Sequence, residues 1–217
     1  HQTDTLPMQG NQSWYLHPDG SLMRQSSDKK GAFTYQYDPA NPVPSLGGEI
    51  YGEGDDQHDG SFDQTSLHSR QDVLVFTSDP LQQALNVFGL ADISLTVSSD
   101  QPDTDFTVKI NELLPDGRAF NLGDTILRMR YREGLEQEKF MAIGETYTIE
   151  LPPILLAKQI AAGSRLQVEV SSSNFPAYAR NLNTAANPYT SKETAVASNT
   201  LHVGDGVIAQ INLPIIE

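Results

Sequence analysis

Two neighbouring segments carry the clearest structural pattern of the chain: Ile93-Ser94-Leu95-Thr96-Val97-Ser98 and Phe106-Thr107-Val108-Lys109-Ile110-Asn111. Apolar and polar residues alternate strictly in both. Successive side chains of a β-strand point to opposite faces, so this alternation gathers the apolar side chains on one face. The two segments therefore predict half-buried antiparallel strands that turn one face toward a core.

The same alternation recurs along most of the chain. Turn-forming sequences such as Pro115-Asp116-Gly117 and Gly204-Asp205-Gly206 separate the segments. About ten short strands at this spacing are typical of a β-sandwich or barrel, so we predict an all-β, antiparallel fold. The other segments predicted as strands are 32–37, 72–77, 126–131, 147–151, 166–170, 195–203 and 207–213.

Helical patterns are weak by comparison. Residues 80–85 and 154–161 predict short helical pieces, the second ended by Gly163. Residues 38–71 differ from both patterns, because they are rich in proline and acidic residues and show little periodicity. A loop of this length inside a compact domain is unusual. We therefore expect residues 38–71 to be functional or to pack against something outside the domain.

The composition is that of a globular domain with an acidic surface. The length of 217 residues suits one domain, and 14 Lys and Arg against 28 Asp and Glu give a net charge of −14. Such a surface repels phosphate backbones and anionic lipids, so we expect no nucleic-acid or membrane partner. The absence of Cys excludes thiol catalysis and disulfides but leaves the localisation open. Because the sequence starts with His1 rather than Met, we expect a piece of a longer protein.

The motifs of common catalytic sites are missing from the sequence. No serine has the Gly-x-Ser-x-Gly flanks of an α/β-hydrolase nucleophile, and the zinc-protease, phosphate-loop and dinucleotide-binding motifs do not occur. The five histidines show no metal-ligand spacing. We therefore expect this chain to contain no catalytic residue and to need no cofactor.

One acidic segment imitates a calcium-binding loop. Asp55, Asp59 and Asp63 take the first, fifth and ninth positions of such a loop. The twelfth position holds Ser66, whereas a calcium loop needs a bidentate Glu there. A solvated acidic loop is the favoured interpretation, and the three aspartates are weak candidates for a metal site.

Asp103 and Asp105 lie close together at the start of a predicted strand. Carboxylates at this spacing can bind a cation or share a proton. Alternatively, a carboxylate pairs with an arginine, for which Arg128, Arg130 and Arg132 are candidates. The structural interpretation is favoured, because two carboxylates on one strand face need a neutralising partner.

Residues 171–184 combine small hydroxyls, an aromatic ring, an arginine and several amides without a regular period. Loops of this kind on a rigid β-sandwich often carry binding sites. Equally, such Ser and Asn side chains can serve only to satisfy backbone groups in a tight crossover. Both interpretations stay open. The candidate contact residues for a substrate or a neighbouring domain are Asn174, Phe175, Tyr178, Arg180 and Asn181.

A series of motifs in fixed order resembles a known family. The motifs are Tyr37-Asp38-Pro39, Gly47-Gly48, Arg70-x-Asp72-Val73-Leu74-x-Phe76-Thr77, Asp103-Thr104-Asp105-Phe106, Arg128-x-Arg130-Tyr131-Arg132, Ser171-Ser172-Ser173-Asn174-Phe175-Pro176 and Arg180-Asn181-x-Asn183-Thr184. In this order they resemble the C-terminal domain of the CocE/NonD hydrolases, which include cocaine esterases, α-amino-acid ester hydrolases, glutaryl acylases and X-Pro dipeptidyl-peptidases. The resemblance extends from about Trp14 to Ile216.

The resemblance implies a jelly-roll β-sandwich, similar to galactose-binding-like domains, that follows a catalytic α/β-hydrolase domain in the same polypeptide. The Ser-Asp-His triad belongs to that preceding domain, which acts on esters, amides or X-Pro peptides, and no residue of this chain matches it. Residues 38–71 are then expected to lie against the hydrolase domain, with Asp56-Gln57 as a docking or loop-fixing element. Asp103 and Asp105 are expected to pair with arginines near the domain boundary, and residues 174–184 to stand near the mouth of the substrate pocket.

A different class of function uses the same sandwich, namely a carbohydrate-binding module assisted by Ca²⁺ in the acidic loop. Sugar platforms need exposed, coplanar aromatic rings. Trp14 is the only tryptophan, and the candidate loop tyrosines are Tyr15, Tyr178 and Tyr189. This is poor equipment for stacking, so the accessory-domain interpretation is favoured.

Overall fold

The computed structural model describes residues 9–48 and 59–216. This part of the chain forms eleven strands and two short 3-10 helices, η1 (Thr65–Leu67) and η2 (Met129–Tyr131). No helix in these two ranges is long and apolar enough to cross a membrane. The strands are β1 (Gln9–Leu16), β2 (Leu22–Met23), β3 (Lys30–Tyr37), β4 (Leu74–Thr77), β5 (Leu85–Ser99), β6 (Asp105–Leu113), β7 (Ala119–Arg128), β8 (Tyr147–Ile160), β9 (Arg165–Ser171), β10 (Ala197–Gly204) and β11 (Gln210–Ile216).

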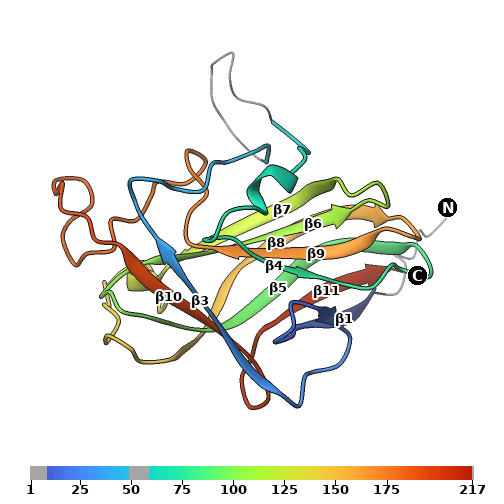
Figure 1. The fold of residues 1–217 in the computed structure, drawn as a ribbon, viewed down its shortest axis with the longest axis horizontal. Coiled ribbons are helices and arrows are strands. Elements are labelled where there is room, and N and C mark those ends of the chain that lie inside the picture. The colour runs from blue at the N-terminus through green and yellow to red at the C-terminus, as the bar shows by residue number, and fades with distance from the viewer. Residues whose placement is uncertain (1–8, 49–58, 217) are drawn as a thin grey trace, which may run out of the picture.

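The long strand β5 organises the larger sheet (Figure 1). β8 pairs with it along one edge, and β11 and β10 share the other edge, where they pair with residues 87–94 and 96–99. β1 and β2 extend the sheet beyond β11, and β3 extends it beyond β10. Because β1 pairs with β11, Gln9 lies opposite Ile216 at one end of this sheet.

The smaller sheet has the order β4-β9-β6-β7 and is antiparallel throughout. Phe106, Val108 and Ile110 of β6 are fully buried against the larger sheet. Thr107, Lys109 and Asn111 point to the opposite face, as the alternation predicts. The two strands predicted from residues 93–98 and 106–111 are thus confirmed within β5 and β6.

The main core fills the space between the two sheets. Burying one large apolar side chain there stabilises the fold by roughly 1.5–3 kcal/mol. The sheets also meet along one side, where Thr125 Oγ1 donates to Pro152 O at 2.8 Å. A Cβ at Gly123 would lie 2.5 Å from Ile154 Cγ2, so this close approach of β7 to β8 requires glycine. The fold is an antiparallel β-sandwich of jelly-roll type, as expected from the sequence.

Both helix predictions are wrong. Residues 154–160 belong to β8, where Ile154, Leu156 and Ile160 face the core while Leu155 is exposed. Backbone pairing with β5 along this stretch overrides a weak local preference. Residues 80–84 form an irregular bend, which is held because Leu81 N–H donates to Ser164 O at 2.8 Å.

The strand predicted for residues 126–131 is correct only in its first half. β7 ends at Arg128, and η2 follows. Met129 N–H donates to Thr104 O at 3.0 Å, and Arg130 N–H donates to Asp103 Oδ1 at 2.8 Å. These bonds draw the chain out of the sheet and end the strand early.

The described residues of the segment 38–71 run over the outer face of the smaller sheet (Figure 1). Val43, Leu67 and Val73 form a second, smaller apolar cluster there. The described residues of this segment therefore pack on their own domain despite their low periodicity. That it also lies against a preceding domain stays a prediction.

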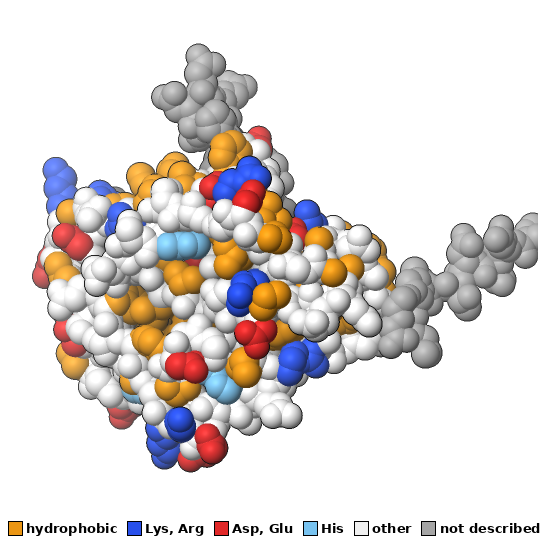
Figure 2. All heavy atoms as spheres, turned by 45° about the vertical axis from the view of Figure 1, so that its right-hand side comes forward, with side chains coloured by type: hydrophobic (Ala, Val, Ile, Leu, Met, Phe, Trp, Pro, Cys, Tyr) orange, Lys and Arg blue, Asp and Glu red, His pale blue; other side chains and the backbone are white. Residues whose placement is uncertain are grey.

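Exposed hydrophobic side chains are scattered over the surface. Figure 2 shows them in several groups on one face, with acidic and basic side chains between them. Phe88, Leu90 and Leu155 are 49%, 56% and 73% exposed, and Leu90 pairs with Leu155 across β5 and β8. A few exposed hydrophobic residues are ordinary on a protein surface.

Candidate functional site

The chain that follows β9 begins with buried polar side chains, each tied to another element. Ser171 Oγ bonds to Thr107 Oγ1, and Ser172 Oγ bonds to the Tyr35 hydroxyl at 2.8 Å. Ser173 Oγ accepts the backbone N–H of Val43 at 2.9 Å. Ser173 thus satisfies a backbone group, as the structural interpretation expects, whereas these bonds of Ser171 and Ser172 go to side chains.

Phe175 marks the point where this segment turns outward, and its ring is 42% exposed. The peptide bond between Phe175 and Pro176 is cis. Phe175 N–H donates to Val43 O at 2.9 Å, and Phe175 O accepts the N–H of Ser45 at 2.7 Å. Two segments that are 130 residues apart thus run side by side in parallel. We call the outer side of residues 43–45 and 173–180 the paired-loop surface.

The candidate contact residues divide between the interior and this surface. Asn174 and Asn181 are buried, being 5% and 2% exposed. Phe175 and Arg180 are exposed, and Tyr178 is half-buried. Arg180 Nη1 also donates to Pro39 O at 2.7 Å, which ties the end of the surface to the other segment.

Two ion pairs, each with a buried carboxylate, lie at the base of the loop. Arg128 donates to both oxygens of Asp105 at 3.0 Å each, and Arg130 Nε donates to Asp103 at 2.7 Å. Asn181 Nδ2 donates to both carboxylates at 2.7 Å. Burial lowers the pKa of each arginine. The hydrogen bonds to its carboxylate and the negative charge of that group raise the pKa by more, so the pKa of each arginine is raised overall. The predicted pairing of both carboxylates with arginines is confirmed.

This ion-pair network fixes the loop instead of supplying a reactive group. Arg128 Nη2 donates to Ala179 O at 2.9 Å, and Arg130 Nη2 donates to Thr184 O at 2.7 Å. Each carboxylate has its own guanidinium partner. In the described ranges, no three His, Cys, Asp or Glu side chains are grouped so that they could hold a metal ion.

The weak calcium candidates have different surroundings. Asp55 lies outside the described residues, as does Asp56-Gln57, and Asp59 is exposed. Asp63 Oδ1 accepts the backbone N–H and the hydroxyl of Thr65 at 3.0 and 2.8 Å. Burial raises the pKa of Asp63, but these and a further backbone bond lower it, and the net pKa is below 3.8. Asp63 therefore fixes the turn before η1.

The candidate aromatic residues do not form a sugar platform in the described part of the chain. Trp14 is only 7% exposed, and the Arg24 guanidinium lies 5.2 Å from its ring centroid. Tyr15 and Tyr178 are half-buried, whereas Tyr189 is 92% exposed on another loop. This geometry gives the carbohydrate-binding alternative no support.

One serine–histidine pair occurs away from the loop. Ser98 Oγ bonds to His202 Nε2 at 2.9 Å between β5 and β10. Among the described residues, no carboxylate forms a hydrogen bond with His202, so the pair is not part of a nucleophile–imidazole–carboxylate relay. It is a cross-strand polar contact.

Sequence reasoning missed a buried polar layer on the outer face of the smaller sheet. Lys109 is 7% exposed, and its Nζ donates to Gln64 Oε1 at 2.7 Å. Glu169 Oε1 accepts Asn111 Nδ2 at 2.6 Å and lies 2.9 Å from His68 Nε2. The only sequence indication was the polar half of the alternation in residues 107–111, which is typical of a solvent-facing surface.

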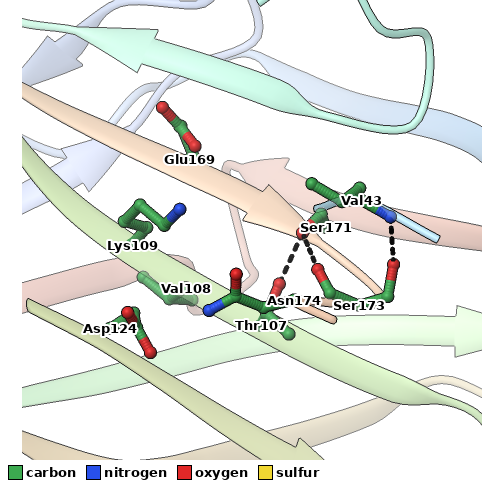
Figure 3. Close-up of a pocket in the computed structure, with 9 residues that line it drawn as sticks. All are labelled: Val43, Thr107, Val108, Lys109, Asp124, Glu169, Ser171, Ser173 and Asn174. Atoms are coloured by element: carbon green, nitrogen blue, oxygen red, sulfur yellow. Dashed lines mark hydrogen bonds between the residues drawn. The ribbon is translucent and has the colours of Figure 1, made fainter. Parts of the chain in front are cut away.

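A small cavity lies within this layer (Figure 3). Its volume is about 10 Å³, comparable to the space that one water molecule needs. Most of the residues around it have polar side chains, and they include the carboxylates of Asp124 and Glu169. The lining residues are Val43, Thr107, Val108, Lys109, Asp124, Glu169, Ser171, Ser173 and Asn174.

Comparisons with known proteins agree with the fold. Residues 1–211 match the family described as the X-Pro dipeptidyl-peptidase C-terminal non-catalytic domain. The cocaine esterase of Rhodococcus sp. (strain MB1 Bresler) is 41% identical over 200 residues, which are 91% of this chain and 34% of that enzyme. The chain thus spans about a third of the curated relative that it matches.

Solved structures show the same architecture. An aminopeptidase from the marine sediment archaeon Thaumarchaeota archaeon has a TM-score of 0.88 and 27% identity, covering 100% of this chain and 39% of that protein. An α-amino acid ester hydrolase has a TM-score of 0.84 and 26% identity, covering 94% of this chain and 36% of that one. On these matches, the chain belongs to the family of X-Pro dipeptidyl-peptidase C-terminal non-catalytic domains, which are C-terminal domains of CocE/NonD-type hydrolases.

Proposed function

We propose that this domain completes a serine hydrolase by packing on a preceding α/β-hydrolase domain and closing one side of its substrate pocket. The substrates would be small esters, amides or X-Pro peptides. The names of the relatives support this, since they describe an esterase, an ester hydrolase and an aminopeptidase. Each relative is also nearly three times as long as this chain, which leaves room for a catalytic domain.

The paired-loop surface is the observation that carries the proposal. The family resemblance implies that the segments 38–71 and 174–184 face the hydrolase domain. Although they are far apart in sequence, backbone hydrogen bonds of Phe175 with Val43 and Ser45 join them. A single face for a partner domain is what such a joint surface would provide.

The surface is well suited to hold a fixed shape. Ser173 is buried in it and hydrogen-bonded to Val43, and Asn181 is buried and hydrogen-bonded directly after it, while Phe175 projects outward. A rigid wall excludes water from a pocket and orients the substrate without supplying the nucleophile. The absence of a nucleophile motif in this sequence agrees with such an accessory role.

The test uses this chain together with the polypeptide that precedes it in its gene. Phe175→Ser removes the exposed ring, and Leu155→Ser is the matched control, because Leu155 is equally apolar and more exposed but lies on β8. Loss of one buried aromatic contact predicts a decrease of about tenfold or more in kcat/KM on an activated ester for Phe175→Ser.

The control is expected to keep the original kcat/KM, and both variants to keep the original melting temperature. Equal activity of Phe175→Ser and the unaltered enzyme would contradict a role of this surface in the pocket. Full esterase activity of the 217-residue chain alone would contradict the accessory role altogether.

A further inference from the structure

Lys109 is linked to the first segment of the paired-loop surface through Gln64. Lys109 Nζ donates to Gln64 Oε1 at 2.7 Å, and Gln64 Nε2 donates to Leu46 O at 2.8 Å. Gln64 is fully buried, and its bond with Lys109 is shielded from solvent. The lysine on β6 is therefore connected by one amide to the residue that follows Ser45.

The second segment reaches the same cavity from the other side. Lys109 and Asn174 both line the cavity of about 10 Å³, and Figure 3 shows their side chains reaching it from β6 and from the chain after β9. An ammonium group has three donors, and Gln64 accepts one of them. Asn174 Oδ1 is buried and has no hydrogen-bond partner among the described residues.

Polar atoms in the cavity wall offer partners to one water molecule, although apolar atoms form most of that wall. Its volume of about 10 Å³ is at the lower limit for one water, and a buried water makes two to four hydrogen bonds. A water can accept a second bond from Lys109 Nζ and donate one to Asn174 Oδ1, which gives that buried oxygen a partner. Asp124 and Glu169, also in the wall, offer acceptors for its second hydrogen.

The surroundings of Lys109 act on its ammonium group in two opposite ways. Burial lowers the pKa of Lys109, and the nearby charges of Glu169 and Asp124 offset part of that decrease. Neither carboxylate forms an ion pair with Lys109 within the described part of the chain. The ammonium therefore depends on Gln64 and on the cavity for its hydrogen bonds.

We propose that the cavity binds one water that joins Lys109 Nζ to Asn174 Oδ1. Lys109 then acts as a positioning residue that couples both segments of the paired-loop surface to the smaller sheet. The coupling is a property of this chain alone. Its use in positioning a pocket wall rests on the proposed function.

Hydrogen exchange of backbone amides in the 217-residue chain tests the coupling. The reporters are the Gln64 N–H, which donates to Ala119 O, and the Phe175 N–H, which donates to Val43 O. In Lys109→Met, both amides are expected to exchange at least about tenfold faster, because hydrogen bonds of a charged group are lost. The core amide of Val168 on β9 is expected to change less.

Lys158→Met is the matched control, because Lys158 is half exposed on the edge strand β8 and only its 3.6 Å contact with Glu112 is lost. It is expected to leave both reporter amides unchanged. If Lys109→Met accelerates Gln64 but leaves Phe175 unchanged, Lys109 holds only one segment and the coupling is wrong.

Asn174→Ala separates the two arms of the connection and does not depend on the folding of Lys109→Met. Removal of the amide is expected to accelerate exchange at Phe175 by about tenfold while Gln64 keeps its rate, because the direct bond to Lys109 remains. In the unaltered chain, nuclear Overhauser contacts are expected between a long-lived water and the Asn174 side-chain amide. Absence of that water signal would overturn the proposed water site, whatever the activity measurements on the longer protein show.

Discussion

The two faces of the smaller sheet are both buried, but by different means. The inner face packs the apolar side chains of Phe106, Val108 and Ile110 against the larger sheet. The outer face carries Lys109 and Asn111 and is covered by the described residues of the segment 38–71. Apolar burial is non-directional, whereas a buried polar group must meet a partner with correct geometry.

This difference indicates how each face responds to change. Any apolar side chain of similar volume can serve the inner face at modest cost. On the outer face, the single side chain of Gln64 donates to Leu46 O and Phe62 O and also accepts a bond from Lys109. Replacing one such side chain leaves several partners unsatisfied at once. The inner face therefore depends on the volume of its side chains, whereas the outer face depends on specific hydrogen-bond partners that also hold its loops.

The largest expected effect comes from a cavity in the inner face. Phe106→Ala is predicted to lower the free energy of unfolding by about 3–5 kcal/mol, because Phe106 is fully buried. Phe88→Ala on the outer side of β5, where Phe88 is 49% exposed, is the control and should cost less than about 1 kcal/mol. Urea unfolding measures both. Equal losses would show that the core does not lie between the sheets.

The outer face is probed by Gln64→Ala. The loss of this amide leaves the buried Lys109 ammonium and the half-buried carbonyl groups of Leu46 and Phe62 without their partner, and we predict a decrease of about 2–3 kcal/mol in the free energy of unfolding. Gln82→Ala is the control, because Gln82 is exposed and donates only to Pro80 O. Limited proteolysis should also cut the segment 59–71 faster in Gln64→Ala. Unchanged stability and cleavage would place this segment outside the cooperative fold.

The sequence was sufficient for the inner face but not for the outer one. The alternation from Phe106 to Ile110 specifies a strand and its buried side without knowledge of its partner. Local pattern failed at residues 154–160, since only pairing with β5 distinguishes that strand from a helix. It also failed at Lys109, whose burial depends on Gln64, a residue 45 positions away. By contrast, the sequence predicted arginine partners for Asp103 and Asp105 among Arg128, Arg130 and Arg132, because two carboxylates on one strand face need a neutralising partner.

A smaller effect is expected from Tyr35, whose hydroxyl bonds to Ser172 beneath the paired-loop surface. Tyr35→Phe should cost about 0.5–1.5 kcal/mol at neutral pH, the net worth of one hydrogen bond. Burial raises the pKa of Tyr35 above its ordinary value of 10.0. Above pH 10 the Tyr35 phenol loses its proton in the unfolded chain but keeps it in the folded chain. The unaltered protein therefore loses stability as the pH rises, by about 1.4 kcal/mol per pH unit for this group. The variant lacks this loss, and its deficit should shrink above pH 10; a deficit independent of pH would contradict a buried phenol.

The smallest effect is expected from Asp63→Asn, which keeps an oxygen at the position that accepts the N–H and hydroxyl of Thr65. The hydrogen bonds hold the folded-state pKa of Asp63 below 3.8. A carboxylate with a lowered pKa stabilises the fold fully above its unfolded value and loses that contribution as pH falls through the folded value. The variant should therefore be less stable than the unaltered chain by under about 1 kcal/mol at neutral pH, and the two should converge in acid. Urea midpoints measured between neutral and acidic pH test this, and a difference that grows in acid would show that Asp63 is not held as an ion by the turn before η1.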